Sequence, residues 1–175
     1  MSKIDGKADI VVSRSGVLTW RGRDYRCAIG RSGIGNDKRE GDGASPAGRF
    51  ALRRVYFRPD RLAPPVTRLP VVALTPADGW CDDPGDPCYN RPVRLPYVAR
   101  AETLWREDHV YDAIAVLGHN DDPPASGKGS AIFLHVARDA YAPTEGCVAL
   151  ALGDLLTVLR DCDPATFLWI GDDSL

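Results

Sequence analysis

Residues 130–150 read SAIFLHVARDAYAPTEGCVAL, and this stretch decides the fold that we expect for the chain. Its first part, Ser130 to Val136, is an apolar run of the length and composition of a buried strand. A similar run, Tyr111 to Leu117, precedes it, and a turn-rich segment from His119 to Gly129 connects the two. The pattern predicts two central strands that pair in the core.

The part of the chain upstream of these strands also has the character of a β protein. Short β-rich runs separated by Arg/Ser/Gly and Gly/Arg/Asp turns predict a meander. A Gly/Asp-rich connector, Gly30 to Gly48, is too rich in glycine for a helix and leads into an alternating strand, Phe50 to Phe57. Lys38, within it, lacks the Gly-Lys-Ser/Thr context of a phosphate loop. The expected strands of the meander are Ala8 to Ser13, Val17 to Trp20 and Tyr25 to Ile29.

The remaining segments are a long loop region and a C-terminal helix and strand. Much of the proline falls in residues 59–97, where Leu69 to Leu74 is the one clear strand, so we expect an irregular excursion over the surface. After Cys147 the apolar pattern becomes helical around Gly153 and Asp154. Asp161 to Pro164 ends this helix, and Thr166 to Ile170 has the pattern of a last strand.

Length and composition indicate one globular domain covering residues 1–175. The chain has 44% hydrophobic and 26% charged residues, which is close to the average for such proteins. A net charge of −2 with interspersed signs argues against a nucleic-acid partner, and no apolar window is long enough to span a membrane. A local cluster of arginines is most simply a solvated face: Arg49, Arg53, Arg54, Arg58 and Arg61.

Five cysteines leave at least one thiol unpaired. Cys81 and Cys88, in a Pro/Asp/Gly-rich stretch, have two readings: a small disulfide loop in an oxidising compartment, or two unrelated free thiols. No second pair with ligand-like spacing accompanies them, so we expect no metal site.

The feature that best predicts chemistry is a histidine followed twelve residues later by a cysteine at a glycine turn. His135 leaves an apolar strand, and Cys147 opens an apolar, partly helical segment. A cysteine just before a helix experiences the positive helix end, which favours the thiolate, while nearby N–H groups can hold an oxyanion. Gly146 allows close approach of the backbone to a substrate. The alternative is a satisfied core histidine and a buried inert thiol.

Two blocks of sequence in the same order resemble the YkuD-type L,D-transpeptidase catalytic domain. The first is His135 followed by Thr144-Glu145-Gly146-Cys147-Val148. The second, upstream, is the segment 43–50, GASPAGRF, which resembles a Thr-Pro-x-Gly-x-Phe block with Ser45 in place of the threonine. The resemblance in character covers most of the chain.

The resemblance implies a mainly β, sandwich-like fold of mixed sheets with a short helix after the nucleophilic cysteine. It implies a peptidoglycan L,D-transpeptidase that needs no cofactor or metal. Cys147 would form a thioester with a donor stem peptide, and His135 would relay protons while the amine of an acceptor diaminopimelate attacks. Alternatives are a hydrolase, acting as carboxypeptidase or amidase on the same thioester, and a catalytically silent peptidoglycan-binding module.

The family also implies a location in the periplasm or cell envelope, with the cytoplasm as the alternative. The start of the sequence, MSKIDGKADIVV, lacks the apolar core of a secretory signal, so the route of export stays open. The sequence likewise leaves open the oligomeric state and the stem-peptide residue, third or first, that acts as donor.

The chain departs from the family pattern near the cysteine. Glu145 stands where many members have histidine, Ala149 stands where an arginine commonly follows, and the interval between His135 and Cys147 is short. Thr144 and Glu145, with Gly146, remain candidates for substrate binding or the oxyanion site. Further candidates at strand ends and in the proline-rich region are His119, Asn120, Trp80 and Arg91. His109, in a charged stretch, is most simply a surface residue.

Overall fold

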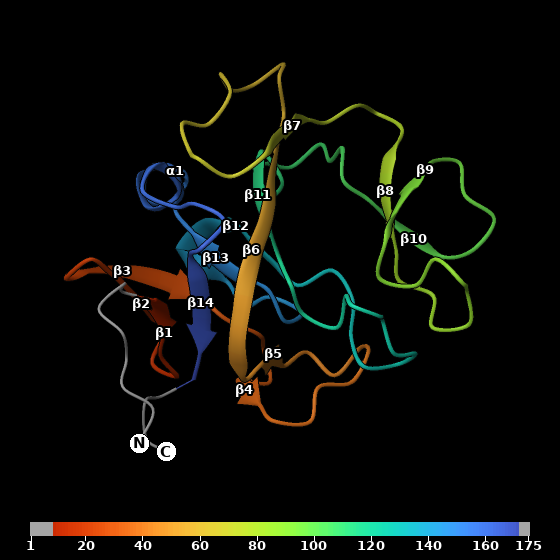
Figure 1. Cartoon of the computed structure of the whole chain (residues 1–175), viewed down its shortest axis with the longest axis horizontal. Coiled ribbons are helices and arrows are strands. Elements are labelled where there is room, and N and C mark those ends of the chain that lie inside the picture. The colour runs from red at the N-terminus through yellow and green to blue at the C-terminus, as the bar shows by residue number, and fades with distance from the viewer. Residues whose placement is uncertain (1–8, 172–175) are drawn as a thin grey trace.

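The computed structural model describes residues 9–171 and has a mainly β fold built on one nine-stranded mixed sheet (Figure 1). The strand order is β11-β12-β13-β3-β2-β1-β14-β6-β7. The strands are β1 (Ile10–Val12), β2 (Val17–Trp20), β3 (Arg23–Ala28), β6 (Gly48–Phe57), β7 (Val71–Ala73), β11 (Ala113–Leu117), β12 (Phe133–Val136), β13 (Val148–Leu150) and β14 (Phe167–Ile170).

The long strand β6 closes this sheet on itself. Residues Gly48 to Ala51 pair with β14, while Leu52 and Val55 to Phe57 pair with β11 at the other end of the order. Strand β7 runs parallel to residues Val55 to Phe57 of β6, beyond the residues that pair with β14. Closure leaves the sheet with an enclosed apolar face and an outer face on which a site can be built.

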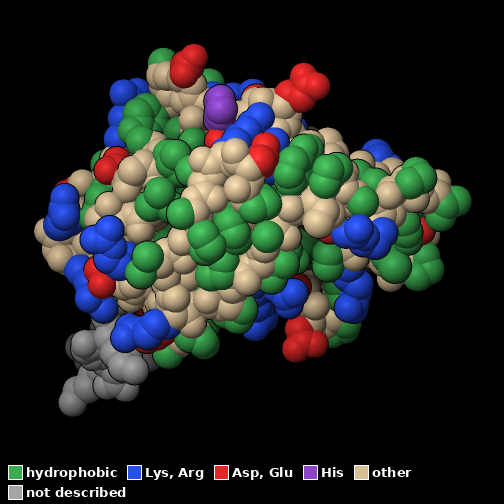
Figure 2. Space-filling view, turned by 90° about the horizontal axis from the view of Figure 1, so that it is seen from above, with side chains coloured by type: hydrophobic (Ala, Val, Ile, Leu, Met, Phe, Trp, Pro, Cys, Tyr) green, Lys and Arg blue, Asp and Glu red, His purple; other side chains and the backbone are tan. Residues whose placement is uncertain are grey.

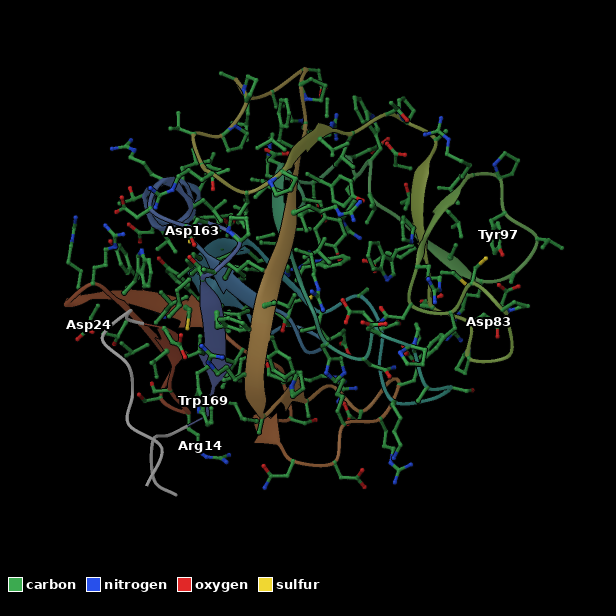
Figure 3. All side chains as sticks on the ribbon, in the orientation of Figure 1. Arg14, Asp24, Asp83, Tyr97, Asp163 and Trp169 are labelled. Atoms are coloured by element: carbon green, nitrogen blue, oxygen red, sulfur yellow. The ribbon has the colours of Figure 1, made fainter. Side chains whose placement is uncertain are left out.

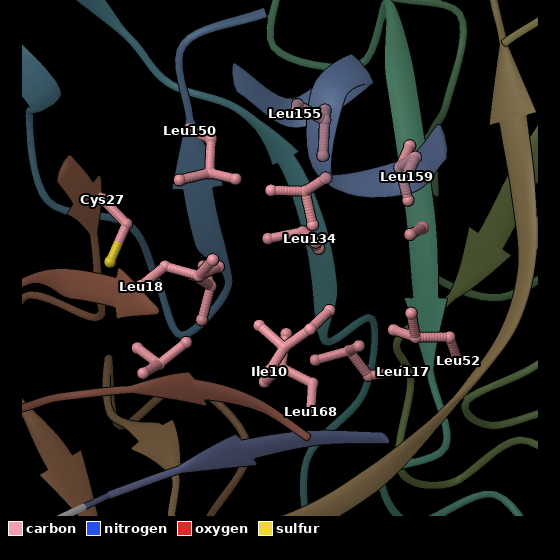
Figure 4. Close-up of a cluster of buried hydrophobic side chains, with 14 of the residues drawn as sticks. Ile10, Leu18, Cys27, Leu52, Leu117, Leu134, Leu150, Leu155, Leu159 and Leu168 are labelled. Atoms are coloured by element: carbon pink, nitrogen blue, oxygen red, sulfur yellow. The ribbon is translucent and has the colours of Figure 1, made fainter. Parts of the chain in front are cut away.

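The enclosed face carries the main hydrophobic core. Figure 4 shows Ile10, Leu134, Leu150 and Leu168 meeting from different strands, all fully buried. The helix α1 (Leu152–Arg160) adds Leu155, Val158 and Leu159 to this cluster. Alternate residues of each strand point into the core, so their neighbours, including His135, face the other side.

The expected strands are present: the meander, the strand containing Phe50 to Phe57, the two central strands and the last strand. Strands β11 and β12 pair antiparallel, as predicted, with Ile114 opposite His135. Ala8, where the first strand was expected to start, lies outside the described residues. The helix after Cys147 is also present, although a strand separates it from the cysteine.

The expectation of an irregular excursion over residues 59–97 was wrong in part. Besides β7, this region and the residues after it form a three-stranded antiparallel sheet: β8 (Asp78–Cys81), β9 (Pro92–Arg94) and β10 (Ala101–Thr103). Its strands have only three or four residues, too few to show a periodic pattern in the sequence. Figures 1 and 3 show this small sheet to one side of the main one, with Asp83 and Tyr97 in its connections.

Two shorter elements complete the structure. Strands β4 (Ile34–Gly35) and β5 (Ser45–Pro46) pair in parallel within the glycine-rich connector. A 3-10 turn, η1 (Asp139–Tyr141), lies between β12 and β13.

Cys81 and Cys88 are free, so the structure contains no disulfide loop between them. The arginine cluster is not wholly the solvated face that was expected, because Arg58 is only 4% exposed and lies over the Trp105 ring. Four of the five clustered arginines form ion pairs, with Asp9, Asp121, Asp60 and Asp112. Both signs of charge are interspersed on the face shown in Figure 2.

No helix within residues 9–171 is long and apolar enough to cross a bilayer.

Candidate active site

A cavity of about 780 Å³ lies where the outer face of β12 meets the small sheet and the glycine-rich connector. Its walls contain charges of both signs around a partly apolar floor. The segment 142–147, which ends the short interval after His135, forms one wall. The charged lining residues are Lys38, Glu40, Asp82, Arg100, Glu102, Arg106, Arg138 and Glu145, and the floor includes Val110, Tyr111, Ile132, His135 and Cys147.

The sheet register places Cys147 and His135 on the same face. Strands β12 and β13 run parallel, with Leu134 opposite Val148 in the core. Cys147 therefore flanks Phe133, and Phe133 and His135, two residues apart on one strand, share the opposite face. Both Cys147 and His135 line the cavity, and Cys147 keeps 9% of its surface exposed. A peptide bound in the cavity would therefore lie against both residues.

The Cys147 thiol is held by backbone groups of the segment that enters β12. Its Sγ accepts a hydrogen bond from the N–H of Phe133 at 3.3 Å and donates to the carbonyl of Ala131 at 3.2 Å. Burial raises the pKa of Cys147 to about 12, and the Phe133 N–H opposes this shift. The resting sulfur is therefore a thiol, and it needs a base before it can attack.

His135 is the imidazole that lines this cavity, and its hydrogen bond defines its tautomer. Its Nδ1 lies 2.9 Å from the carbonyl oxygen of Val136, and because a carbonyl can only accept, Nδ1 carries the proton. The lone pair is then on Nε2. Burial lowers the pKa of His135 to about 4, so the ring is neutral near pH 7. The ring of Tyr111 packs edge-on against it at 5.4 Å between centroids, which fixes its orientation.

The expectation that Cys147 directly precedes a helix was wrong. Strand β13 follows the cysteine, and α1 begins only at Leu152. The apolar residues after Cys147 fit both a short buried strand and the start of a helix, and pairing with β12 and β3 favours the strand. The positive end of α1 therefore does not act at the sulfur, since such an effect is confined to the first turn of a helix.

The turn before Cys147 is shaped by Thr144 and Gly146. The Thr144 hydroxyl donates to the Cys147 carbonyl at 2.6 Å and accepts from the Gly146 N–H at 3.1 Å. Gly146 has φ +145°, and a Cβ there would lie 2.8 Å from the Ala44 carbonyl. Only glycine suits this position. Because the Gly146 N–H is donated to Thr144, it is not free in this structure to hold an oxyanion.

The upstream block around Ser45 supports the same turn from behind. Ser45 is fully buried, and its hydroxyl accepts a hydrogen bond from the Gly30 N–H at 2.9 Å. Gly30 and Thr144 form a β-bridge, and the Arg31 N–H donates to the Thr144 carbonyl at 2.8 Å. The two blocks of sequence that carry the family resemblance thus meet in space.

Glu145, next to this turn, points away from the buried part of the site. Its side chain is 78% exposed and forms an ion pair with Arg31 at 3.0 Å. It lines the mouth of the cavity. Ala149, where the family commonly has arginine, is buried beside His135 in the sheet, opposite Ala28.

The structure does not bring the other four predicted site residues to the cavity. His119 lies 3.1 Å from the Lys128 carbonyl through Nε2, and Asn120 bonds to Ala125 and Gly129 within the same loop. Trp80 is buried, donates to Asn90 at 3.0 Å, and packs edge-on against Phe133. Arg91 is exposed outside the cavity. His109 lies at the surface, as expected, and contacts Asp112 at 2.7 Å.

Sequence reasoning missed a set of polar side chains that line the cavity around the cysteine and histidine. The Tyr111 hydroxyl donates to the Glu102 carboxylate, whose pKa is raised by burial. Arg106 binds Asp108 through two contacts of 2.8 and 2.6 Å, and Arg138 lies 3.6 Å from Asp108. Charged stretches in the sequence look like solvated surface, so no local signal distinguishes these residues.

Within residues 9–171, no group of three or more His, Cys, Asp or Glu side chains is arranged to hold a metal ion. Comparison with family models matches residues 5–170 to YkuD, the L,D-transpeptidase catalytic domain. Searches of curated proteins and of solved structures found no significant match. The family match spans nearly the whole chain, including both sequence blocks and the cavity that they build. The chain therefore belongs to the L,D-transpeptidase catalytic-domain family.

Proposed function

We propose that the protein is a peptidoglycan L,D-transpeptidase with Cys147 as nucleophile and His135 as general base. The observation that carries this proposal is the shared position of the two side chains on one face of β12 and β13, in one cavity. A binding module without catalysis needs neither a thiol nor an imidazole there. Both groups are neutral at rest, so in this proposal the thiol proton moves to the imidazole as sulfur attacks the substrate.

The first half of the reaction makes a thioester. The S–H bond of Cys147, which donates a hydrogen bond to the Ala131 carbonyl at rest, breaks, and its proton passes to Nε2 of His135 as sulfur attacks the carbonyl carbon of the donor stem peptide. The tetrahedral intermediate collapses with cleavage of the C–N bond. The departing amine of the terminal D-residue takes the proton from His135, and the acyl group remains on sulfur.

The second half transfers the acyl group. The amine of an acceptor diaminopimelate attacks the thioester carbonyl and gives a proton to Nε2 of His135. A new C–N bond forms, the C–S bond breaks, and the thiolate of Cys147 recovers the proton. When water replaces the amine, the same steps release a shortened stem peptide.

The charges of the cavity support a substrate that has both carboxylates and amines. Arginine binds carboxylates through paired N–H groups, and Arg138, with 54% of its side chain exposed, is the most accessible arginine beside His135. Glu102 and Asp82 on the opposite wall offer partners for an ammonium group. Diaminopimelate carries both kinds of group on one side chain.

The test is incubation with purified disaccharide-tripeptide and disaccharide-tetrapeptide fragments, with products resolved by mass. We expect cross-linked dimers whose formation stops in Cys147→Ser. Trimmed monomers without dimers would assign the hydrolase, and unchanged fragments with every donor offered would contradict enzymatic function. Fragmentation of the dimers identifies the donor residue.

We also propose that the protein acts in the cell envelope, because its substrate is located there. Fractionation of cells that express the native chain, followed by immunodetection, tests this location. Recovery only in the cytoplasmic fraction would contradict it.

A further inference from the structure

Lys38 is a buried cation next to the proposed nucleophile, and the mechanism above does not use it. Only 8% of the residue is exposed, which is unusual for lysine. It lines the same cavity as Cys147 and His135. It comes from the glycine-rich connector, far from both in the sequence.

Two glycines leave the space through which the Lys38 side chain passes. A Cβ on Gly129 would lie 2.9 Å from Lys38 Cγ and 3.1 Å from Cε, and a Cβ on Gly146 would lie 3.4 Å from Nζ. Both glycines have positive φ, +103° and +145°. The ammonium group therefore lies directly beside the turn that presents Cys147.

The Lys38 ammonium group is held in place by one carboxylate. Its Nζ donates to Asp42 Oδ1 at 2.5 Å. Asp42 is itself fixed by the N–H groups of Ala44 and Arg39, at 2.9 and 2.8 Å. A lysine that costs side-chain entropy and desolvation to bury is thus oriented by a rigid turn, with two remaining N–H donors.

We propose that Lys38 is the fixed positive charge that stabilises the anion formed at Cys147 during thioester formation and transfer. No helix N-terminus shares this task, because β13 follows the cysteine, and Lys38 adds a full positive charge to the hydrogen bond that the Phe133 N–H donates to the sulfur. Two charged side chains act on the Cys147 thiol: Glu102, which raises its pKa, and Lys38, which lowers it. A buried charge acts strongly because solvent screens it little.

This inference rests on the proposed role of Cys147, and its test measures the sulfur directly. The rate of Cys147 alkylation by iodoacetamide at neutral pH, read by mass spectrometry of the Cys147 peptide, reports the thiolate fraction. In Lys38→Met we expect alkylation about tenfold slower and a comparable loss of dimer formation. Lys38→Arg, which keeps the charge, should retain most of both rates.

Lys128→Met is the matched control, because Lys128 is a half-exposed lysine whose ion-pair partner is Asp37, at 3.7 Å. It should leave both rates unchanged. If Lys38→Met retained the wild-type alkylation rate, with or without a loss of stability, Lys38 would be a structural partner of Asp42 only and the proposal would be overturned.

A second variant should make the electrostatic potential at the Cys147 sulfur more positive, the opposite of the effect of Lys38→Met. Asp42→Asn keeps an Oδ1 acceptor for Lys38 and Ala44, gives up the hydrogen bond from the Arg39 N–H to Oδ2, and removes the opposing negative charge, so Cys147 alkylation should become faster by about threefold or more. An equal or slower rate would overturn the proposal, even if Lys38→Met did not fold. Retained dimer formation in Cys147→Ser would instead defeat the proposed function, whatever the alkylation rates are.

Discussion

At the scale of single residues, the site separates the roles of its thiol and its imidazole by their hydrogen bonds. The Val136 carbonyl fixes the proton of His135 on Nδ1, and the Ala131 carbonyl accepts a hydrogen bond from the Cys147 thiol. Both groups rest in their neutral forms. Catalysis then depends on charge that appears only during the reaction, which is where a preoriented cation is most effective.

The first prediction concerns the thiols. Cys147→Ser should lower dimer formation at least about a thousandfold, because a serine hydroxyl is a much weaker nucleophile at the same position. Cys27→Ser and Cys162→Ser are matched controls, since burial raises the pKa of each of these thiols to about 12, as it does for Cys147. Neither control residue lines the cavity.

Both control variants should remain active, with some loss of stability from burying a hydroxyl. Steady-state rates and denaturation curves measured on the same preparations separate the two effects. Full activity in Cys147→Ser would refute the assignment of the nucleophile.

At the scale of structural elements, the turn 144–147 joins the loop after β12 to β13 and determines where the sulfur lies. The short strands around it pair with β3 and with the connector, so the turn is supported on both sides. A change in its backbone is therefore expected to move Cys147 without unfolding the sheet.

The second prediction compares two glycines. Gly146→Ala forces an L side chain into φ +145° against the Ala44 carbonyl, and should cost about 1–3 kcal/mol of stability with nearly complete loss of activity. Gly153→Ala, in the exposed first turn of α1 where a Cβ meets nothing within 4 Å, should gain up to about 1 kcal/mol and keep activity. Urea denaturation followed by tryptophan fluorescence measures the stability of both variants, and dimer formation measures their activity. A Gly146→Ala protein as active as Gly153→Ala would show that the turn conformation is dispensable.

At the scale of the whole molecule, burial of His135 makes the free energy of unfolding depend on pH. Its pKa falls from 6.5 in an exposed histidine to about 4 in the fold. Between these values the unfolded chain binds a proton that the folded chain does not. The third prediction is that up to about 3 kcal/mol of stability, fully present above pH 6.5, is lost as the pH falls toward 4.

Denaturation midpoints measured across this range test the effect. His135→Gln should reduce the dependence, and the part that remains in this range comes from His119, whose pKa is also lowered by burial. Asp108 also contributes to stability, because its pKa is lowered to about 2, chiefly by its hydrogen bond to Arg106. This contribution is lost only below pH 3.8, so it can be separated from that of His135. An unchanged slope in His135→Gln would contradict the buried neutral state.

The sequence by itself predicted eight of the nine strands of the main sheet, the helix near Leu152, and the motif that contains His135 and Cys147. Alternation and apolar runs are local properties, and the motif around Cys147 is contiguous. The short strands of residues 78–103 and the strand between Cys147 and the helix could not be predicted, because strands of three or four residues are too short to show a periodic pattern.

Only the tertiary structure decided what surrounds the thiol. Closure of the sheet through β6 and the packing of the connector bring Lys38 beside Gly146, while Glu102 comes from β10 of the small sheet and Arg106 from the segment after it. The tertiary structure also places His119 and Arg91 outside the cavity. The physical reason is that the charges in a cavity depend on contacts between distant segments, whereas the sequence records only the order of residues along the chain.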